Sequence, residues 1–504
     1  MPAVKTKRVY TDSRAKRTSA RRIFAWPVAV PVAILHRDFS ARTPPSVRQI
    51  VAFAALVLTA GAAAWLAPNI LGSTVHAMLW LSFMGNALLR LAATCLPRQS
   101  ISLKPRPAND ADLPSYSVIV PLYQEAQLAP QLLAAMLALD YPRDRLEVLI
   151  ALEADDQATQ HAFHALDLPP HVRVVIIPQP VDNEPRTKPR ALNHALAQAR
   201  GQFVVIYDAE DRPHPDQLMA AVEAFRASDD RLACLQAPLR PVGGQHFIGR
   251  QFAAEYAVQF DLVLPALNAL GLPFPLGGTS NHFRTDVLKA IGGWDAHNVT
   301  EDADLGLRLA QLGFTSGLIA PPTLETPPDT SRVWLPQRTR WIKGFLQTIM
   351  VHMRLTAPFK ARVWLSMTLS LAMSALAALA YAPFTATVVI TLLAAMPGKA
   401  VLQDADLALF MIGNLSAMVS LHIGARRAGL TLRATDLLLA PFYWCLHSIA
   451  AVFALYQLVA KPFHWDKTEH APAHNPLASE GAYAYAEAHA DRGLAGNLAH
   501  HGLG

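Results

Sequence analysis

The sequence predicts a membrane protein in which a Rossmann-like α/β domain with a mostly parallel sheet is inserted between transmembrane helices. Its 504 residues are 52% hydrophobic and 16% charged, which is too apolar for an ordinary soluble enzyme. Long apolar runs lie on both sides of a central region, residues 113–353, that carries most of the acidic residues. Within this region short β-rich runs alternate with helical patterns, as in a doubly wound sheet.

Residues 1–47 form a basic arm that we expect in the cytosol. Much of the net charge of +6 comes from this arm, and such basic clusters favour the cytosolic side of a membrane beside anionic lipid. No zinc-spaced or aromatic-interleaved motif accompanies the basic residues, so we expect no nucleic-acid partner. Prolines interrupt residues 23–35 and no small-residue cleavage pattern follows, which favours an interfacial helix over a signal peptide.

Two apolar runs predict two transmembrane helices within residues 48–97, because about 20 apolar residues cross the hydrocarbon core as a helix. These runs are residues 50–66 and 75–96. Two crossings return the chain to the cytosol, so we expect the domain of residues 113–353 there.

Further apolar runs predict about four more helices within residues 363–460; they are residues 363–380, 382–396, 407–424 and 437–458. An even total returns residues 461–504 to the cytosol as a flexible tail. The same count puts Arg426, Arg427 and Arg433 outside, against the preference of basic residues for the cytosolic side. The sequence alone leaves this conflict open.

Acidic residues follow three of the four predicted strands, residues 117–121, 146–152, 172–177 and 203–207. Ligands of a doubly wound sheet bind beyond the carboxyl ends of its strands, so these acids are candidate site residues. They are Glu125 after the first strand, Glu153, Asp155 and Asp156 after the second, and Asp208, Glu210 and Asp211 after the fourth. No glycine-rich phosphate loop follows the first strand, which argues against a dinucleotide dehydrogenase or a P-loop NTPase.

Asp208 and Glu210 form an acid-x-acid triplet of the kind that holds a divalent cation. Mg²⁺ and Mn²⁺ accept a few carboxylate oxygens and keep other positions for phosphate and water. Two prolines, Pro213 and Pro215, favour a break in the strand that would let both acids reach one ion. Most such triplets are solvated loop acids, so the motif depends on its context.

In motif order, residues 113–353 resemble the processive, membrane-bound family 2 glycosyltransferases, the group of bacterial cellulose synthase, chitin synthase and hyaluronan synthase. The resemblance rests on residues 117–125 (SVIVPLYQE), the acids Glu153, Asp155 and Asp156, residues 188–193 (KPRALN), 208–210 (DAE), 300–302 (TED) and 337–341 (QRTRW). The last two segments are the most specific. The family often has Asp where Glu210 stands, so Asp211 remains an alternative ligand.

The resemblance implies a GT-A fold, an inverting mechanism and a role for each matched residue. Asp302 is implied as the general base that removes a proton from the acceptor hydroxyl. The implied donor-binding residues are Glu125, Glu153, Asp155, Lys188 and Asp208, and the implied ligands of Mg²⁺ or Mn²⁺ are Asp208 and Glu210. The residues implied at the acceptor and the diphosphate are Thr300, Glu301, Gln337, Arg340 and Trp341.

Each of these motifs also has a purely structural explanation. The acids of residues 300–302 could cap a helix, Lys188 could be a surface cation, and Arg340 with Trp341 could anchor the chain at the membrane interface. An aromatic face such as that of Trp341 can hold a sugar, however, and guanidinium matches phosphate oxygens, which favours the functional interpretation.

The function implied by the resemblance is transfer of a sugar, with glucose expected, from a UDP-sugar to a growing β-linked polysaccharide. The expected location is the inner membrane, and the expected partners are UDP-glucose, a glycan acceptor, membrane lipid and export proteins. The alternative is a single-sugar transferase that acts on a membrane lipid carrier with the same fold, donor and Asp302. The sequence does not fix the sugar, the linkage or the primer.

Overall fold

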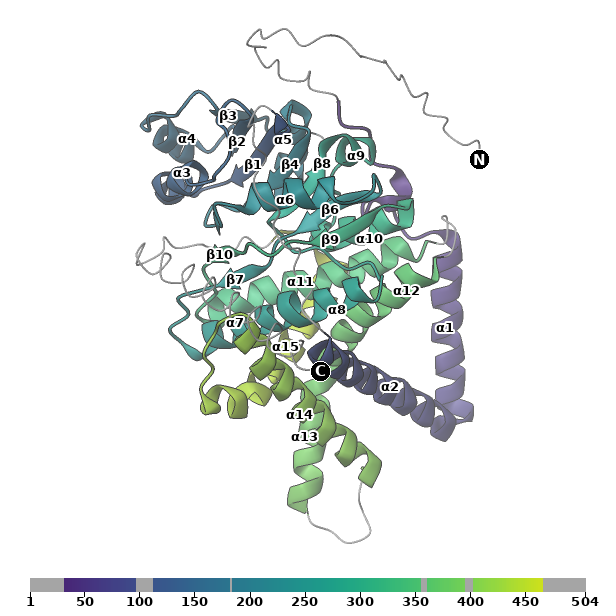
Figure 1. The fold of residues 1–504 in the computed structure, drawn as a ribbon. Coiled ribbons are helices and arrows are strands. Elements are labelled where there is room, and N and C mark those ends of the chain that lie inside the picture. Colours follow the sequence, from purple (N-terminus) through teal and green to yellow (C-terminus); the bar gives the residue numbers. More distant parts are fainter. Residues whose placement is uncertain (1–30, 97–111, 182–183, 355–359, 395–401, 466–504) are drawn as a thin grey trace, which may run out of the picture.

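The computed structural model describes residues 31–96, 112–181, 184–354, 360–394 and 402–465. Most of the predicted basic arm and of the predicted tail, residues 1–30 and 466–504, lies outside the described residues. Figure 1 shows an α/β domain on one side of a helical region, from which helices α13 and α14 extend away from the sheet.

The centre of the domain is a seven-stranded sheet in the order β3-β2-β1-β4-β8-β6-β9. Its strands are β1 (Tyr116–Leu122), β2 (Leu146–Glu153), β3 (Val172–Ile177), β4 (Phe203–Ile206), β6 (Leu232–Gln236), β8 (Asn281–Arg284) and β9 (Thr315–Leu318). Strands β1 to β4 pair in parallel, whereas β8 runs antiparallel to both β4 and β6. The four predicted strands are β1 to β4, and the mostly parallel fold class is confirmed.

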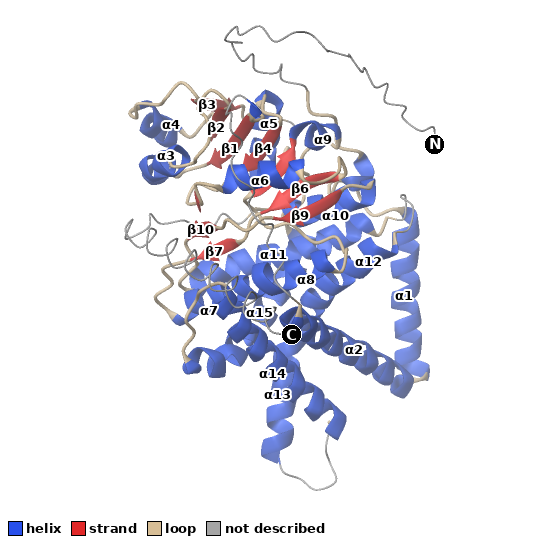
Figure 2. Cartoon of the chain, viewed as in Figure 1, coloured by secondary structure: helices blue, strands red, loops and turns tan. Residues whose placement is uncertain are grey.

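Helices cover both faces of this sheet, which explains why β2 is buried along its whole length. One hydrophobic core includes residues of α3 (Ala129–Leu137), α4 (Gln157–His164) and α6 (Gln217–Arg226). The other includes residues of α5 (Lys188–Gln198), α8 (Leu264–Ala269), α9 (Thr285–Ala290) and α10 (Glu301–Leu312). Figure 2 shows the strands as a layer between these helices.

The second half of the sheet was not predicted from the sequence. The sequence of β8 is typical of a polar loop. In the structure, however, His282 is fully buried and its Nδ1 lies 2.6 Å from the Tyr116 hydroxyl. Three further short strands, β5 (Arg212–Pro213), β7 (Leu239–Pro241) and β10 (Thr323–Glu325), form a small separate sheet.

The described residues contain five helical stretches long and apolar enough to cross a membrane. They are α1 (Val47–Leu66), α2 (Pro68–Cys95), Ala361–Leu393, α14 (Asp404–Arg427) and α15 (Ala434–Ala460). The prediction of about four helices after the domain is wrong for these residues, because residues 363–380 and 382–396 belong to one continuous stretch. That stretch combines α12 (Ala361–Met367), a π-helical turn (Thr368–Ala372) and α13 (Met373–Ala394).

The end of α14 lies beside the end of α2. Arg427 Nη2 donates to the carbonyl oxygens of Thr94 and Leu96 at 3.0 and 3.1 Å. Because the domain follows α2 directly, Arg427 lies on the domain side of the bundle. The structure thus has Arg427 on the same side of the helices as the domain, whereas the predicted count had put it on the opposite side.

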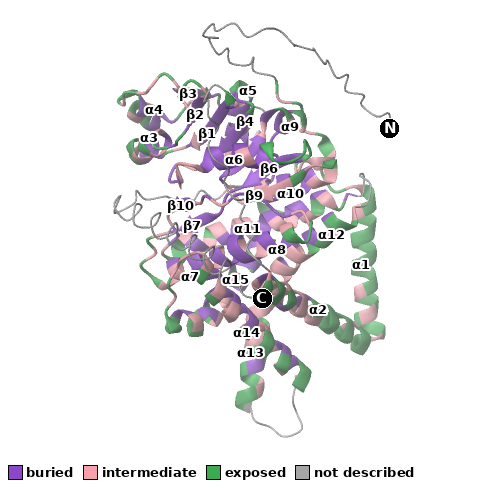
Figure 3. Cartoon of the chain, viewed as in Figure 1, coloured by how far each residue is buried: buried purple, intermediate pink, exposed green. Residues whose placement is uncertain are grey.

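Two helices of the domain, α7 (Phe247–Val258) and α11 (Ser331–His352), pack against the candidate membrane helix α15. Trp334 near the start of α11 donates to the Tyr443 hydroxyl at 2.8 Å, and Lys343 farther along donates to Gln457 at 3.0 Å. Helix α15 therefore runs parallel to α11. Figure 3 shows the contrast with α1, most of which is exposed.

Candidate active site

A single cavity of about 620 Å³ runs from the carboxyl ends of the parallel strands to the space between α2, α13 and α14. All the residues to which the resemblance assigns a role line it except Asp155, whereas the other two candidate acids, Asp156 and Asp211, do not. The two ends of the cavity differ in chemistry: one part lies at the domain (the domain half), and the other lies between the helices (the membrane half).

The loops after β1 and β2 supply the outer wall of the domain half. Glu125 and Glu153 line it and are almost fully buried. Burial raises the pKa of Glu153, although Arg190 lies 3.4 Å from it and acts in the opposite direction. Asp155 does not line the cavity; its carboxylate pairs with Arg186 Nη1 at 2.7 Å, and Arg186 reaches the cavity in its place.

Lys188 at the start of α5 links two walls of the domain half. Its ammonium forms an ion pair with Asp208 and donates to the Gly278 carbonyl at 2.7 Å. The loop after β4 is held by Asp211, which accepts from the Asp208 amide at 2.7 Å and from the Thr279 hydroxyl. Lys188 is therefore a partly buried cation held by two contacts and not a free surface residue.

Asp208 and Glu210 both line the cavity, so the acid pair predicted for a cation faces the same space as Lys188. Asp211 is instead buried behind them, and burial with the neighbouring Asp208 and Glu210 raises its pKa well above the usual range. Within the part of the chain that the structure describes, no group of three or more His, Cys, Asp or Glu forms a complete metal site. Two carboxylates fit a Mg²⁺ or Mn²⁺ ion that takes its remaining ligands from a diphosphate and water.

The start of α10 carries the acids of residues 300–302. Burial and the adjacent Asp302 raise the pKa of Glu301 to about 8, and burial also raises the pKa of Asp302. A Cβ added to Gly278 would lie at an ordinary contact distance, 3.5 Å, from Asp302 Oδ2, and both residues line the cavity. Thr300 is packed against Gly344 of α11, where a Cβ would come within 2.4 Å of its side chain.

Gln337, Arg340 and Trp341 line the cavity from α11. Arg340 donates to the Val299 carbonyl at 3.3 Å, while its Nε and the Gln337 Oε1 are buried polar atoms without a partner among the described residues. Both atoms are therefore suited to bind a polar ligand. The Arg338 guanidinium lies over the Trp341 ring, and its Cζ is 4.3 Å from the centroid of that ring.

Several residues of the cavity were not found by sequence reasoning. Glu325 of β10 lines it beside the acids of the β4 loop, and burial raises its pKa well above the usual range. Trp465, which follows α15, also lines the cavity, and its ring lies 4.4 Å from the Arg340 guanidinium. No local motif marks either residue, because only the tertiary fold brings them to the site.

The comparisons with known proteins agree with this geometry. A family model described as "Glycosyltransferase like family 2" matches residues 114–344. The probable glycosyltransferase YdaM of Bacillus subtilis (strain 168) is 27% identical over 239 residues, which are 47% of this chain and 56% of that protein. Cellulose synthase 2 of Novacetimonas hansenii is 30% identical over 291 residues, 55% of this chain and 18% of that protein.

A beta-monoglucosyldiacylglycerol synthase of Synechocystis is 28% identical over 293 residues, 56% of this chain and 60% of that protein. Among solved structures, a mannosyltransferase of Pyrobaculum calidifontis in complex with GDP-Man and Mn²⁺ matches with a TM-score of 0.49 and 22% identity. That match covers 77% of this chain and 99% of the other. The chain spans less than two thirds of the length of each of these three sequence relatives.

The family match covers the whole α/β domain and ends within α11, and membrane helices lie before and after it. Relatives named as cellulose synthases align over about half of the chain: 55%, 49% and 50% of it. Residues 114–344 are thus a glycosyltransferase family 2 domain of the cellulose synthase type, and helices long and apolar enough to cross a membrane lie on both sides of it.

Proposed function

We propose that this protein transfers a sugar, with inversion, from a UDP-sugar to an acceptor hydroxyl that reaches Asp302 from the membrane side. The observation that carries the proposal is the continuity of one cavity from the acids at the strand ends, past Asp302, to the membrane helices. UDP-glucose is the donor we expect, and the acceptor we propose first is a growing β-linked glycan.

The donor part of the proposal is supported by the charges of the domain half. Asp208 and Glu210 would hold a Mg²⁺ or Mn²⁺ ion, which when bound offsets the charge of the diphosphate. Lys188, already fixed by Asp208 and Gly278, and Arg340, with its unpartnered Nε, would supply further positive charge to the departing diphosphate.

Asp302 is the residue we propose as the general base. Its Oδ1 accepts from the amide of Ala303 at 2.8 Å, which fixes the carboxylate, while Oδ2 faces the backbone of Gly278. An acceptor hydroxyl at Oδ2 would give up its proton as its oxygen attacks the anomeric carbon from the face opposite the diphosphate. The metal-stabilised leaving group needs no second carboxylate as acid.

A membrane lipid that receives a single sugar is the second candidate acceptor. The apolar lining of the membrane half favours it, because residues such as Leu371, Phe384 and Phe410 can contact acyl chains. The relative named as a beta-monoglucosyldiacylglycerol synthase supports the same candidate.

The test is incorporation of radiolabelled sugar from a panel of UDP-sugars into membrane vesicles that contain the full chain. A long glycan that is lost in Asp302→Asn would support a synthase, and label confined to an organic-extractable lipid would support the second candidate. If no donor gives a product that depends on Asp302, the proposed function is wrong.

A further inference from the structure

We propose that the membrane half of the cavity binds an acceptor lipid whose head group carries a negative charge, such as a phosphate, and that Arg90 pairs with this charge. The inference rests on the proposed function, because it names the class of acceptor used at the same site. It applies whether the lipid receives one sugar or carries a growing chain.

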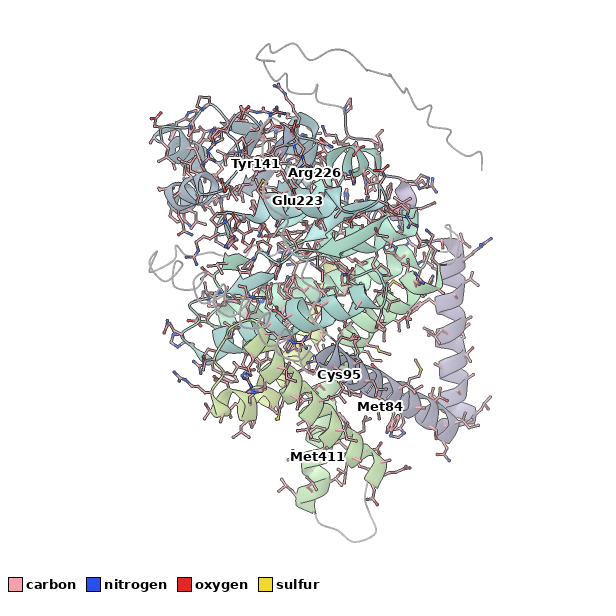
Figure 4. The ribbon with its side chains drawn as sticks, in the orientation of Figure 1. Met84, Cys95, Tyr141, Glu223, Arg226 and Met411 are labelled. Carbon is pink, nitrogen blue, oxygen red and sulfur yellow. The ribbon has the colours of Figure 1, made fainter. Side chains whose placement is uncertain are left out.

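Arg90 is a charged residue within a predicted membrane span. It lies in α2 five residues before Cys95, or about one and a half helical turns, and it lines the cavity. Figure 4 labels Cys95 near the domain end of α2 and Met84 farther from the domain, so Arg90, which lies between them in the sequence, belongs to the domain end. A charge in a span is costly unless it meets a counter-ion or a polar ligand.

The carboxylate best placed to neutralise Arg90 is already occupied. Glu255 of α7 interacts electrostatically with Arg90, but its oxygens accept from the two Arg338 nitrogens at 3.0 and 2.7 Å. The Tyr443 hydroxyl also donates to Glu255 at 3.0 Å, and His447 Nε2 lies 3.4 Å from it. One carboxylate thus serves two guanidinium groups, and the excess positive charge lies in the wall of the cavity.

Within the described ranges, Arg90 has no hydrogen bond and no ion pair of its own. A guanidinium with free N–H groups matches the oxygens of a phosphate or carboxylate bidentately. The chemistry that complements this position is therefore an anionic group, held at the depth of a lipid head group near the domain end of α2.

The walls beyond Arg90 are suited to hydrocarbon chains. The aromatic and aliphatic residues there include Phe83, Leu371, Tyr381, Phe384, Leu409 and Phe410. Gly413 adds open space, since no heavy atom lies within 4 Å of the position that its Cβ would take. Burial of chains against such walls is favourable by the hydrophobic effect.

The polar side chains of the membrane half are largely satisfied by groups of their own or adjoining helices. Asn86 donates to the Ser82 carbonyl at 3.1 Å, Asn414 to the Phe410 carbonyl at 2.8 Å and Ser370 to the Ser366 carbonyl at 2.6 Å. These bonds satisfy the side chains locally and leave fewer groups for the hydroxyls of a bare polysaccharide. The lining therefore favours a lipid over a free glycan in this half.

The experiment measures which lipids the full-length protein retains in phosphatidylcholine nanodiscs. Separate nanodiscs contain a small fraction of a polyprenyl phosphate, of phosphatidylglycerol or of neutral diacylglycerol, and native mass spectrometry counts the retained lipid. We expect retention of one anionic lipid roughly tenfold above that of diacylglycerol. The anionic lipid that is retained identifies the source of the charged group.

Arg90→Gln should abolish this preference, whereas Arg90→Lys should keep a substantial part of it because the charge remains. The matched control is Arg426→Gln, which removes an exposed arginine at the domain end of α14 that does not line the cavity and should change nothing. Equal retention of neutral and anionic lipid by the wild type, or unchanged retention in Arg90→Gln, would overturn the inference.

Asp302→Asn separates this inference from the proposed function, since it should retain the anionic lipid as the wild type does. Selective lipid retention without any Asp302-dependent product would support the lipid site and contradict the proposed transfer. Asp302-dependent transfer without an anionic preference would contradict the lipid site alone.

Discussion

The two halves of the cavity are built by different means. The domain half takes charged side chains from loops at the ends of rigid strands, and ion pairs such as Lys188 with Asp208 fix their positions. The membrane half takes aromatic, aliphatic and small residues from α2, α13 and α14, and its shape depends on how these helices pack. We infer that the domain half determines the chemistry and the membrane half determines the acceptor, so changes in the two halves should affect different steps.

The largest effect should come from the proposed base. Asp302→Asn keeps the shape of the side chain but cannot accept the proton, so we expect the transfer rate to fall by about 100-fold to 10,000-fold. Donor affinity should stay within about twofold, because the change removes no proposed diphosphate contact. Transfer above about a tenth of the wild-type rate would contradict the role of Asp302.

Asp208→Asn should come next, because it weakens both the proposed cation site and the ion pair to Lys188. We expect transfer to fall about 100-fold and the apparent affinity for Mg²⁺ or Mn²⁺ to fall with it. Chelation should abolish wild-type transfer, and added cation should restore it. Asp286→Asn, at an exposed acid of α9, is the matched control and should behave as the wild type. Full activity in chelator would rule out the cation.

A change in the membrane half should slow transfer moderately by hindering binding of the acceptor, without changing binding of the donor. Gly413→Leu places a side chain in the open space of the cavity, so we expect roughly tenfold slower transfer with unchanged donor affinity. Gly61→Leu in α1 also enters open space but does not line the cavity, and it should leave both quantities unchanged. A loss of donor affinity in Gly413→Leu would show that the halves are not separable.

The smallest expected effect concerns pH. Burial raises the pKa of Asp302, and the protonated acid cannot act as a base, so the rate should fall as the pH drops through this raised pKa. The positive charges of Lys188 and Arg340 lower the pKa of Asp302. Arg340→Gln removes one of these charges, so the pKa should rise and the acidic limb of the pH–rate profile should move to higher pH. The profile is measured at saturating donor, since Arg340 is also a proposed diphosphate contact. An acidic limb that moves to lower pH would contradict this electrostatic coupling.

The domain half could largely be predicted from the sequence, and the membrane half could not. Asp208, Asp302 and Trp341 belong to short motifs that can be recognised in the amino-acid sequence alone. Arg90 and Trp465 reach the cavity through contacts between segments far apart in the chain, and no local pattern marks them. The helix count differs for a related reason, since α13 continues through residue 381, where two apolar runs had suggested a break between two helices.

The parallel packing of α15 on α11 has a consequence for biosynthesis. Lys343 is fully buried, and its ammonium donates to Gln457 at 3.0 Å, to the Lys461 carbonyl at 3.4 Å and to the His464 carbonyl at 2.8 Å. These acceptors are made more than 110 residues after Lys343, since they stand 114, 118 and 121 positions later in the chain. When synthesis of the family 2 domain is complete, α11 therefore still exposes this cation, and Trp465 can reach the cavity only after α15 has been made and has docked on α11.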